Sequence, residues 1–225
     1  YSDKDRVKKI KEMSDNRDII ILSKGHAAAA LIATLKNSGI QPKIDLNTYL
    51  QNGSKLGGHA TKNMVGVEFS TGSLGHGLPI GLGVAIARKL SRKMGKVFVV
   101  MSDGELNEGT TWESALIANH FALDNLIIII DRNRLQSLKS TEDTIALEPL
   151  AYKWRSFGFE VLDVDGHSFS KLIDAINADS SKPKVIIANT IKGKGVSYME
   201  SSILWHYRAP NKDELAIALK EISNS

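Results

Sequence analysis

Two short, uninterrupted apolar segments constrain the fold of this chain more than any other feature. Val97–Met101 contains only valine, phenylalanine and methionine, and Leu126–Ile130 contains four consecutive isoleucines. Because both faces of such segments are apolar, they predict interior strands of a parallel sheet that is covered by helices on both sides. The sequence between them, at 109–122, predicts the crossover helix that two neighbouring parallel strands require.

The rest of the chain continues this alternation of strands and helices. Further strands are predicted at residues 18–22, 159–164 and 184–189, although 18–22 is also compatible with an extended lead-in to the next helix. Further helices are predicted at residues 27–37, 78–90, 148–157, 169–178 and 212–222, with a long polar loop at 131–147. Gly81 and Gly83 should let the helix at 78–90 pack closely against a neighbour. We therefore predict a single α/β domain over residues 1–225, with a parallel sheet flanked by helices.

Polar residues follow both of the buried segments directly. Asp103 and Gly104 come after the first, and Asp131 and Asn133 come after the second. Ligands of open parallel sheets bind outside the carboxyl ends of the strands. Oxygens of Asp103 and Asn133 could therefore converge on Mg²⁺, which takes its remaining ligands from a substrate's phosphates. This pattern alone would also permit an unrelated Mg²⁺-dependent phosphotransfer domain.

Three further segments place a histidine beside glycine. His26 precedes a predicted helix, His59 follows two glycines in a loop, and His76 belongs to a glycine-rich loop at 71–77. A glycine-rich loop before a helix is a suitable site for an anion. Taken alone, however, a single histidine is more often structural, and many glycine-rich loops only turn the chain.

Six ordered motifs make the chain resemble the N-terminal half of transketolases. Asp103-Gly104 followed by Asn133 resembles the thiamine diphosphate motif of that family, with Ser102 and Arg132 departing from its usual glycine and asparagine. The six motifs are SKGHA (23–27), GGHA (57–60), STGSLGHG (70–77), DGELNEG (103–109), DRNRLQ (131–136) and WHYRAP (205–210). The resemblance runs from about Asp18 to the C-terminus and implies the thiamine diphosphate-binding fold, in its diphosphate-binding form.

The resemblance implies a cofactor site. Asp103, Asn133 and the backbone carbonyl of Leu135 correspond to the Mg²⁺ ligands of the family. The residues that correspond to cofactor contacts are His26, Gly72, Leu74, His76, Asp103, Gly104, Glu105, Asn133 and His206.

The resemblance also implies catalytic roles. His26, His59 and His206 match histidines that line the channel to the reactive carbon of the cofactor, where they bind substrate oxygens and move protons. Glu108 matches an acidic residue that joins two cofactor sites across a subunit interface. Glu105 and Glu108 could instead stabilise the start of the next helix electrostatically.

By this likeness the chain is the thiamine diphosphate- and Mg²⁺-binding subunit of a transketolase. Such an enzyme transfers a two-carbon ketol unit from a ketose donor, expected to be phosphorylated, to an aldehyde acceptor. The family's pyrimidine-binding domain, with the glutamate that activates the cofactor, has no counterpart here and is expected on a C-terminal partner chain. Two copies of each chain are the expected complex.

Two departures from the family leave alternatives open. The chain begins after the position of an early histidine-bearing GHPG-like segment of full transketolases. Tyr207 and Arg208 stand where the family usually has a small residue, which suggests a specialised sugar or 2-oxo acid donor. A non-catalytic homologue that only binds a partner would have no need of Asp103, Asn133 and the three histidines.

Composition argues against several other classes of protein. The absence of cysteine excludes disulfides and cysteine chemistry, and no apolar run approaches 18 residues, so no membrane span is predicted. No signal peptide is visible, which makes the cytoplasm the expected location. The net charge of +4 is spread along the chain apart from a basic run between Lys4 and Lys11, and aromatics are only 6%. Neither nucleic acid nor membrane is therefore an expected partner.

Overall fold

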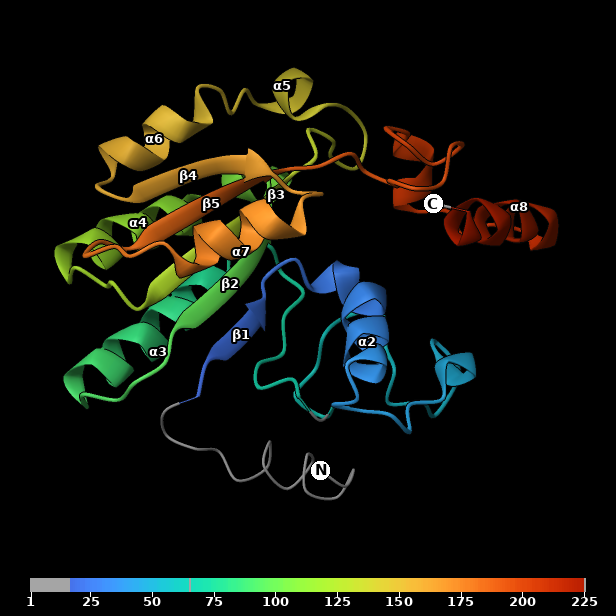
Figure 1. Ribbon diagram of the computed structural model, residues 1–225, viewed down its shortest axis with the longest axis horizontal. Helices are drawn as coiled ribbons and strands as arrows, with labels where there is room; N and C mark the ends of the chain where they lie inside the picture. The colour runs from blue at the N-terminus through green and yellow to red at the C-terminus, as the bar shows by residue number, and fades with distance from the viewer. Residues whose placement is uncertain (1–16, 65, 225) are drawn as a thin grey trace.

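The computed structural model describes residues 17–64 and 66–224, and this part of the chain forms a five-stranded parallel sheet (Figure 1). The strands are β1 (Ile19–Leu22), β2 (Val97–Ser102), β3 (Leu126–Arg132), β4 (Glu160–Asp165) and β5 (Lys184–Asn189), in the spatial order β1-β2-β3-β5-β4. Every pairing is parallel. The predicted parallel α/β fold is confirmed, and residues 19–22 form a strand.

The two apolar segments form the interior of the sheet, as predicted. Val97, Val99 and Met101 of β2 are inaccessible to solvent, as are Leu126 and Ile128 of β3. The register pairs Ser102 with Asp131, so β2 and β3 end at the same level. The polar residues that follow these strands therefore lie side by side at the carboxyl edge.

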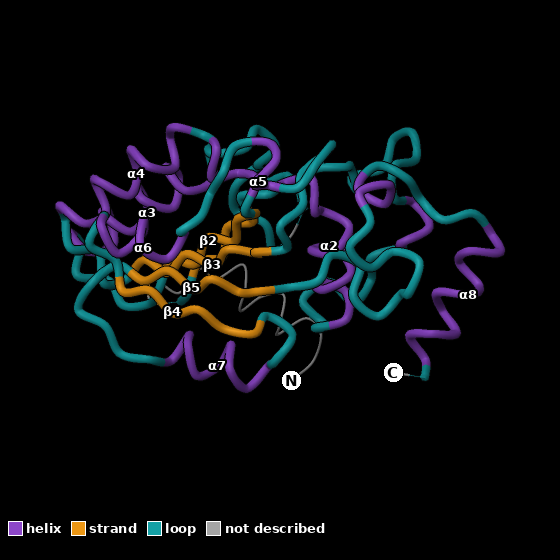
Figure 2. The backbone as a smooth tube through the Cα atoms, turned by 90° about the horizontal axis from the view of Figure 1, so that it is seen from above, coloured by secondary structure: helices purple, strands orange, loops and turns teal. Residues whose placement is uncertain are grey.

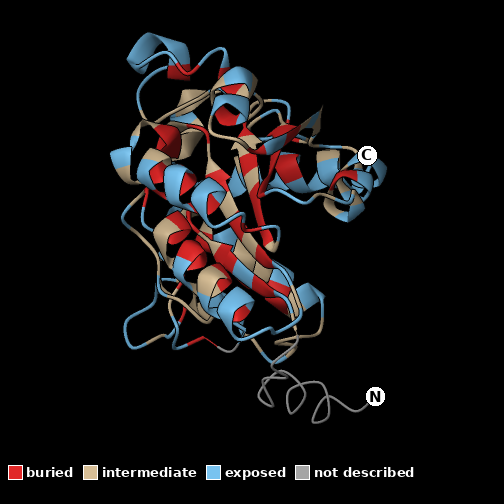
Figure 3. Ribbon diagram, turned by 90° about the vertical axis from the view of Figure 1, so that its left-hand side faces the viewer, coloured by how far each residue is buried: buried red, intermediate tan, exposed pale blue. Residues whose placement is uncertain are grey.

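Helices cover both faces of the sheet (Figure 2). The helices are α2 (Ala28–Asn37), α3 (Gly77–Leu90), α4 (Gly109–His120), α5 (Thr141–Thr144), α6 (Leu150–Ser156), α7 (Phe169–Asn177) and α8 (Lys212–Ser223). Helices α3, α4 and α6 bury Leu82, Ala115 and Trp154 in the main core, whereas α7 covers the opposite face with Ala175. Figure 3 shows the buried residues concentrated on the strands and on the sides of the helices that face them.

Helix α2 and the C-terminal segment with α8 lie beyond the carboxyl ends of the strands (Figures 1 and 2). Helix α2 has its own small core, in which Ala28, Ile32 and Leu35 pack with Leu56 and Met64. These two elements therefore flank the edge of the sheet where Asp103 and Asn133 are predicted to bind a ligand.

Glycine allows α3 to approach the sheet at one of the two predicted positions. A Cβ atom at Gly81 would lie 2.5 Å from Val99 Cγ2, so any larger residue would push α3 away from β2. Gly83 is exposed and no atom lies within 4 Å of the position that its Cβ would occupy. The close packing predicted for Gly83 was wrong, because this residue faces away from the sheet.

Other differences from the predicted elements are small. The loop at 131–147 contains the short helix α5, and α6 begins at Leu150, after a cis peptide bond between Glu148 and Pro149. The basic run between Lys4 and Lys11 lies outside the described residues. Within residues 17–64 and 66–224, no helix is long and apolar enough to cross a membrane.

Candidate functional site

A cavity of about 360 Å³ opens at the carboxyl ends of β2 and β3. It is lined by Lys24, His26, Gly72, Leu74, Ser102, Gly104, Asn133, Leu135, Gln136, Ser137, Lys192, His206 and Tyr207. Most of the residues expected to bind the cofactor or the metal ion belong to this lining. The fold therefore brings together motifs that lie far apart in the sequence.

Asp103 lies at the end of β2 with its carboxylate completely buried. Its Oδ1 accepts a hydrogen bond from the Gly104 N–H at 2.8 Å, and its Oδ2 accepts from the Arg134 N–H at 2.5 Å and from Arg132 Nη1 at 3.1 Å. Burial raises the pKa of Asp103, and the bonds from Arg134 and Arg132 oppose that shift. Asp103 does not itself line the cavity, whereas its neighbour Gly104 does.

The oxygen atoms of and near Asp103 fit the coordination of a magnesium ion whose remaining ligands are phosphate oxygens. An ionised carboxylate has about four acceptor positions, and the three bonds to Asp103 leave one of them open on Oδ1. Asn133 and Leu135 line the adjoining cavity wall, and the Asn133 side-chain oxygen accepts from the Leu135 N–H at 3.0 Å. The described residues contain no group of three or more His, Cys, Asp or Glu side chains that could hold a metal ion. A mixed set of carboxylate, amide and carbonyl oxygens is instead the kind that Mg²⁺ completes with phosphates.

The glycine-rich loop at 71–77 contributes Gly72 and Leu74 to the cavity lining, and Glu105 holds this loop in place. Glu105 is completely buried and accepts hydrogen bonds from the N–H groups of Gly75, at 2.8 Å, and Ser102, at 3.3 Å, and from the Ser23 hydroxyl. Burial raises the pKa of Glu105, and the bonds from Ser23, Gly75 and Ser102 oppose that shift. Glu105 thus braces the loop that carries Gly72 to the cavity, and its carboxylate does not line the cavity.

Four basic side chains surround the same cavity. Lys24 Nζ donates to Asp131 Oδ2 at 2.5 Å, while the side-chain Nζ of Lys192 makes no hydrogen bond or ion pair within the described residues. Burial and the charge of Lys24 lower the pKa of Lys192. The rings of His26 and His206 lie 5.6 Å apart, and the Nδ1 of His206 is buried without a hydrogen-bond partner in the part of the chain that the structure describes. The charges of Lys24 and Lys192, together with the unpartnered ring nitrogen of His206, fit an anionic ligand such as a diphosphate.

Comparison with known proteins identifies the family to which the chain belongs. A profile described as "Transketolase, thiamine diphosphate binding domain" matches residues 4–223. The chain belongs to the transketolase family. It is 44% identical over 215 residues to one of the subunits of the apulose-4-phosphate transketolase of Actinobacillus succinogenes, and the match covers 94% of this chain and 78% of the relative.

Two further transketolases extend the comparison. The chain is 36% identical to the 6-deoxy-6-sulfo-D-fructose transketolase subunit SqwG of a Clostridium species, covering 92% of this chain and 76% of the relative. The crystal structure of transketolase from Campylobacter jejuni superimposes with a TM-score of 0.85 at 31% identity, covering 93% of this chain and 34% of that one. The fold is therefore the thiamine diphosphate-binding fold of transketolases, as predicted.

Besides Asp103 and Glu105, three further predicted site residues of this transketolase domain lie outside the cavity lining. The ring of His59 lies beside Gly72, since a Cβ atom on Gly72 would be 3.3 Å from His59 Cδ2. His76 is exposed, with its Nδ1 3.0 Å from the carbonyl oxygen of Leu74, and Glu108 is exposed beside Gly75. The catalytic and cofactor roles of these three side chains therefore stay predictions.

Sequence reasoning missed two lysines of the site. Lys192 belongs to a Lys-Gly-Lys-Gly segment directly after β5, and glycines with lysines at a strand end are a signal for an anion site. Lys24 lies within the motif that supplied His26, but it received no role. Arg208 is not part of the site, since it pairs with Glu214 at 2.5 Å and lies over the ring of Trp205. Only Tyr207 of the two departing residues reaches the cavity.

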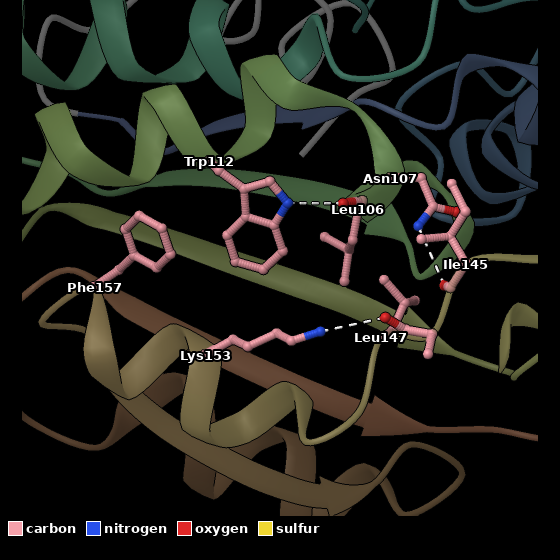
Figure 4. A pocket seen from close by; sticks show the side chains of 8 residues that line it. Leu106, Asn107, Trp112, Ile145, Leu147, Lys153 and Phe157 are labelled. Atoms are coloured by element: carbon pink, nitrogen blue, oxygen red, sulfur yellow. Dashed lines mark hydrogen bonds between the residues drawn. The ribbon is translucent and has the colours of Figure 1, made fainter.

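A second cavity, of about 270 Å³, lies between α4, α6 and the segment at 145–147 (Figure 4). Its polar groups are already used within the protein: Trp112 Nε1 donates to the Leu106 carbonyl at 2.8 Å, and Lys153 Nζ donates to the Ala146 carbonyl at 3.3 Å. Because these groups already have partners, the first cavity is the better candidate for a site of chemistry.

The histidines of the first cavity should be uncharged at neutral pH. Burial, followed by repulsion from Lys24, His206 and Lys192, lowers the pKa of His26 to about 4, and burial and Lys192 also lower the pKa of His206. Since protonation of His26 then favours the unfolded chain, its contribution to stability should fall as the pH drops from about 6.5 towards 4. NMR titration of the His26 ring should find a midpoint near 4, and Lys192→Met should raise it. A midpoint near 6.5 would contradict the burial of His26 among cations.

Proposed function

We propose that this chain is the thiamine diphosphate- and Mg²⁺-binding subunit of a two-chain transketolase. Its reaction moves a two-carbon ketol unit from a ketose donor to an aldehyde acceptor. The observation that carries the proposal is the cavity at the ends of β2 and β3, where Gly104 and Asn133 meet Lys192, His26 and His206. The whole chain acts as one diphosphate-binding domain.

Different residues of the cavity bind different parts of the cofactor and its metal ion. Gly72, Leu74 and Gly104 bring backbone close to the diphosphate, while Lys24 and Lys192 neutralise its charge. Asp103, Asn133 and the carbonyl of Leu135 hold Mg²⁺. When bound, thiamine diphosphate supplies the carbanion chemistry of the reaction.

The histidines contribute proton transfer and orientation. A neutral imidazole has one donor and one acceptor nitrogen, so His26 and His206 can bind substrate hydroxyls and move protons between them. The lowered pKa values of both rings support this role. His59, whose ring lies beside Gly72, would contact the incoming sugar. Each positioned acid–base group is typically worth about 10²- to 10⁴-fold in rate.

A partner chain completes the active site. Relatives are named as subunits of transketolases, and the pyrimidine-binding domain would be supplied by the partner, in an assembly of two copies of each chain. Leu116, Ile117 and Phe121 are exposed around the end of α4, the helix that follows Glu108. Exposed apolar side chains of this kind support a subunit interface at the C-terminal end of α4. The complex would work in the cytoplasm.

The donor is a sugar that carries a terminal anion. Relatives are named for apulose 4-phosphate and for 6-deoxy-6-sulfo-D-fructose, whose anionic groups are a phosphate and a sulfonate. Tyr207 lines the cavity and packs edge-on against His206, with 4.8 Å between the ring centroids. A ring at this position supports selection of a specialised donor, with a 2-oxo acid as the alternative.

Calorimetric titration of thiamine diphosphate with Mg²⁺ tests the proposal. Binding should be weak for this chain alone and tight for the complex with a C-terminal transketolase partner, because the partner covers the pyrimidine half of the cofactor. Absence of binding in a complex that demonstrably forms would favour a scaffold that binds a partner but no cofactor.

Two lysines of one loop provide a matched pair of variants for this titration. Lys192→Met should weaken binding roughly 10- to 100-fold, since a hydrogen bond to a charged group is worth about 1.5–3 kcal/mol. Lys194 is exposed and pairs with Glu200 at 3.4 Å, away from the cavity lining. Lys194→Met should therefore bind like the wild type, and equal effects of the two changes would refute a direct role of Lys192.

A further inference from the structure

Arg132 ends β3 and is buried, with a relative exposure of 2%. Its Nη1 donates to Asp103 Oδ2 at 3.1 Å and to the Thr141 hydroxyl at 2.8 Å. Its Nη2 donates to Glu148 Oε1 at 2.7 Å and to Glu142 Oε1 at 3.4 Å. One guanidinium therefore joins the end of β2, the short helix α5 and the start of α6.

The contacts of Arg132 lie close to the residues that are proposed to ligate the metal ion. Asp103 is bound by Arg132 directly, and Asn133 and Leu135 follow Arg132 in the chain. Arg134 lies between Asn133 and Leu135 in the chain, and its N–H donates a hydrogen bond to the same Asp103 Oδ2 at 2.5 Å. Arg134 adopts a φ of 66°, a left-handed conformation that costs a residue with a side chain roughly 1–2 kcal/mol. The turn that carries Asn133 and Leu135 is thus held against Asp103 at an energetic cost.

The two glutamates extend this restraint along the polar loop. Glu142 Oε1 also accepts from the Leu147 N–H at 3.1 Å, and Glu148 Oε2 accepts from the Leu150 N–H at 2.8 Å. Without Arg132, three carboxylates would face one another without the cation that now joins them, and their repulsion would loosen the loop. Lysine is a poor substitute, because a single ammonium group cannot match the fork geometry of a guanidinium.

We propose that Arg132 is the positioning residue of the metal site. It occupies Oδ2 of Asp103 and so turns Oδ1 towards the cation, and it fixes the loop that presents Asn133 and Leu135. The inference rests on the proposed function, since that function assigns the metal donors. Carboxylates that bind metals are themselves hydrogen-bonded, and loss of such partners typically costs about 10- to 100-fold in metal affinity.

Titration of Mg²⁺ at a fixed, saturating concentration of thiamine diphosphate tests this role. In the full-length chain with its partner, Arg132→Met should raise the Mg²⁺ concentration for half-saturation roughly 10- to 100-fold, and Arg132→Lys should restore part of the loss. At saturating Mg²⁺, the affinity for thiamine diphosphate should change little, because Arg132 does not line the cavity.

Arg88 provides a matched control for a buried arginine with a purely structural role. It lies in the last turn of α3, and its Nη2 donates to the carbonyl oxygens of Arg17 and Met94, both at 2.5 Å. Arg88→Met should lower the melting temperature and leave the Mg²⁺ dependence unchanged. If Arg132→Met does not fold, Glu148→Gln, which changes a half-exposed partner of Arg132, should produce a smaller rise in the Mg²⁺ requirement.

The outcomes separate this inference from the proposed function. A wild-type complex that binds no thiamine diphosphate with Mg²⁺ would overturn the proposed function itself. A wild-type complex that binds normally, beside Arg132→Met or Glu148→Gln complexes with the same Mg²⁺ dependence, would overturn only the positioning role of Arg132.

Discussion

Replacing Asp103 with asparagine should abolish the Mg²⁺-dependent binding of thiamine diphosphate. Asparagine keeps the shape of the side chain but removes the negative charge that makes a carboxylate a good ligand for a hard cation. The change also deprives Arg132 of its buried carboxylate partner, and breaking a buried ion pair typically costs about 3–5 kcal/mol. Calorimetric titration, with and without Mg²⁺, should therefore show no difference for this variant, and thermal melting should show a lower midpoint.

The stability loss must be separated from the loss of binding. Titrations are made at a temperature where the variant without ligand is fully folded, so that weak binding cannot reflect unfolding. Asp163 lies on β4 of the same sheet, away from the cavity lining, and its Oδ1 accepts a hydrogen bond from Asn189. Asp163→Asn should bind the cofactor like the wild type. Retained Mg²⁺ dependence in Asp103→Asn would remove Asp103 from the metal site.

The order of the sheet could be predicted from the sequence only in part. The fully apolar segments of β2 and β3 indicate interior strands, because no face of either can meet water. Strand β4 carries charges at Glu160, Asp163 and Asp165 and lies at the edge, where charged side chains are tolerated. These charges indicate an edge strand, but the apolar pattern alone does not predict that β5 lies between β3 and β4.

The sequence predicts those site residues that come directly after the ends of strands. Gly104, Asn133 and Leu135 come to the cavity because β2 and β3 end in register, which the sequence pattern anticipates. Lys192 was missed because its loop is separated from the other motifs, and only the pairing of β5 with β3 brings it to the same edge.

The roles of buried polar residues were the least predictable. Glu105 and Arg132 belong to recognisable motifs, but their partners come from other parts of the chain: Gly75 for Glu105, and Thr141 and Glu148 for Arg132. A carboxylate that binds a ligand and one that braces a loop are identical in sequence. Only the packing of the loops around them distinguishes the two roles.

Replacing Gly77 with alanine should destabilise the protein strongly. A Cβ atom there would lie 2.6 Å from Ser23 Cα, and closer still to Ser23 Oγ. Ser23 cannot retreat, because its N–H donates to the Val100 carbonyl at 2.8 Å and its hydroxyl donates to Glu105. We expect a loss of at least about 3 kcal/mol, the upper end of typical overpacking costs, or roughly 6–12 °C in melting temperature for a chain of this size.

Gly83 lies in the same helix as Gly77, so Gly83→Ala is a matched control for Gly77→Ala. It is exposed, with no atom within 4 Å of the position that an added methyl group would take, so Gly83→Ala should raise stability by roughly 0.5–1 kcal/mol through its helix preference. Two identical chemical changes in one helix should thus shift the melting temperature in opposite directions. Gly77→Ala should also weaken cofactor binding, because the displaced loop carries Gly72 and Leu74. A Gly77→Ala protein that melts like the wild type would show that the loop and β1 do not meet as closely as this, and Glu105 could then not brace the cavity wall.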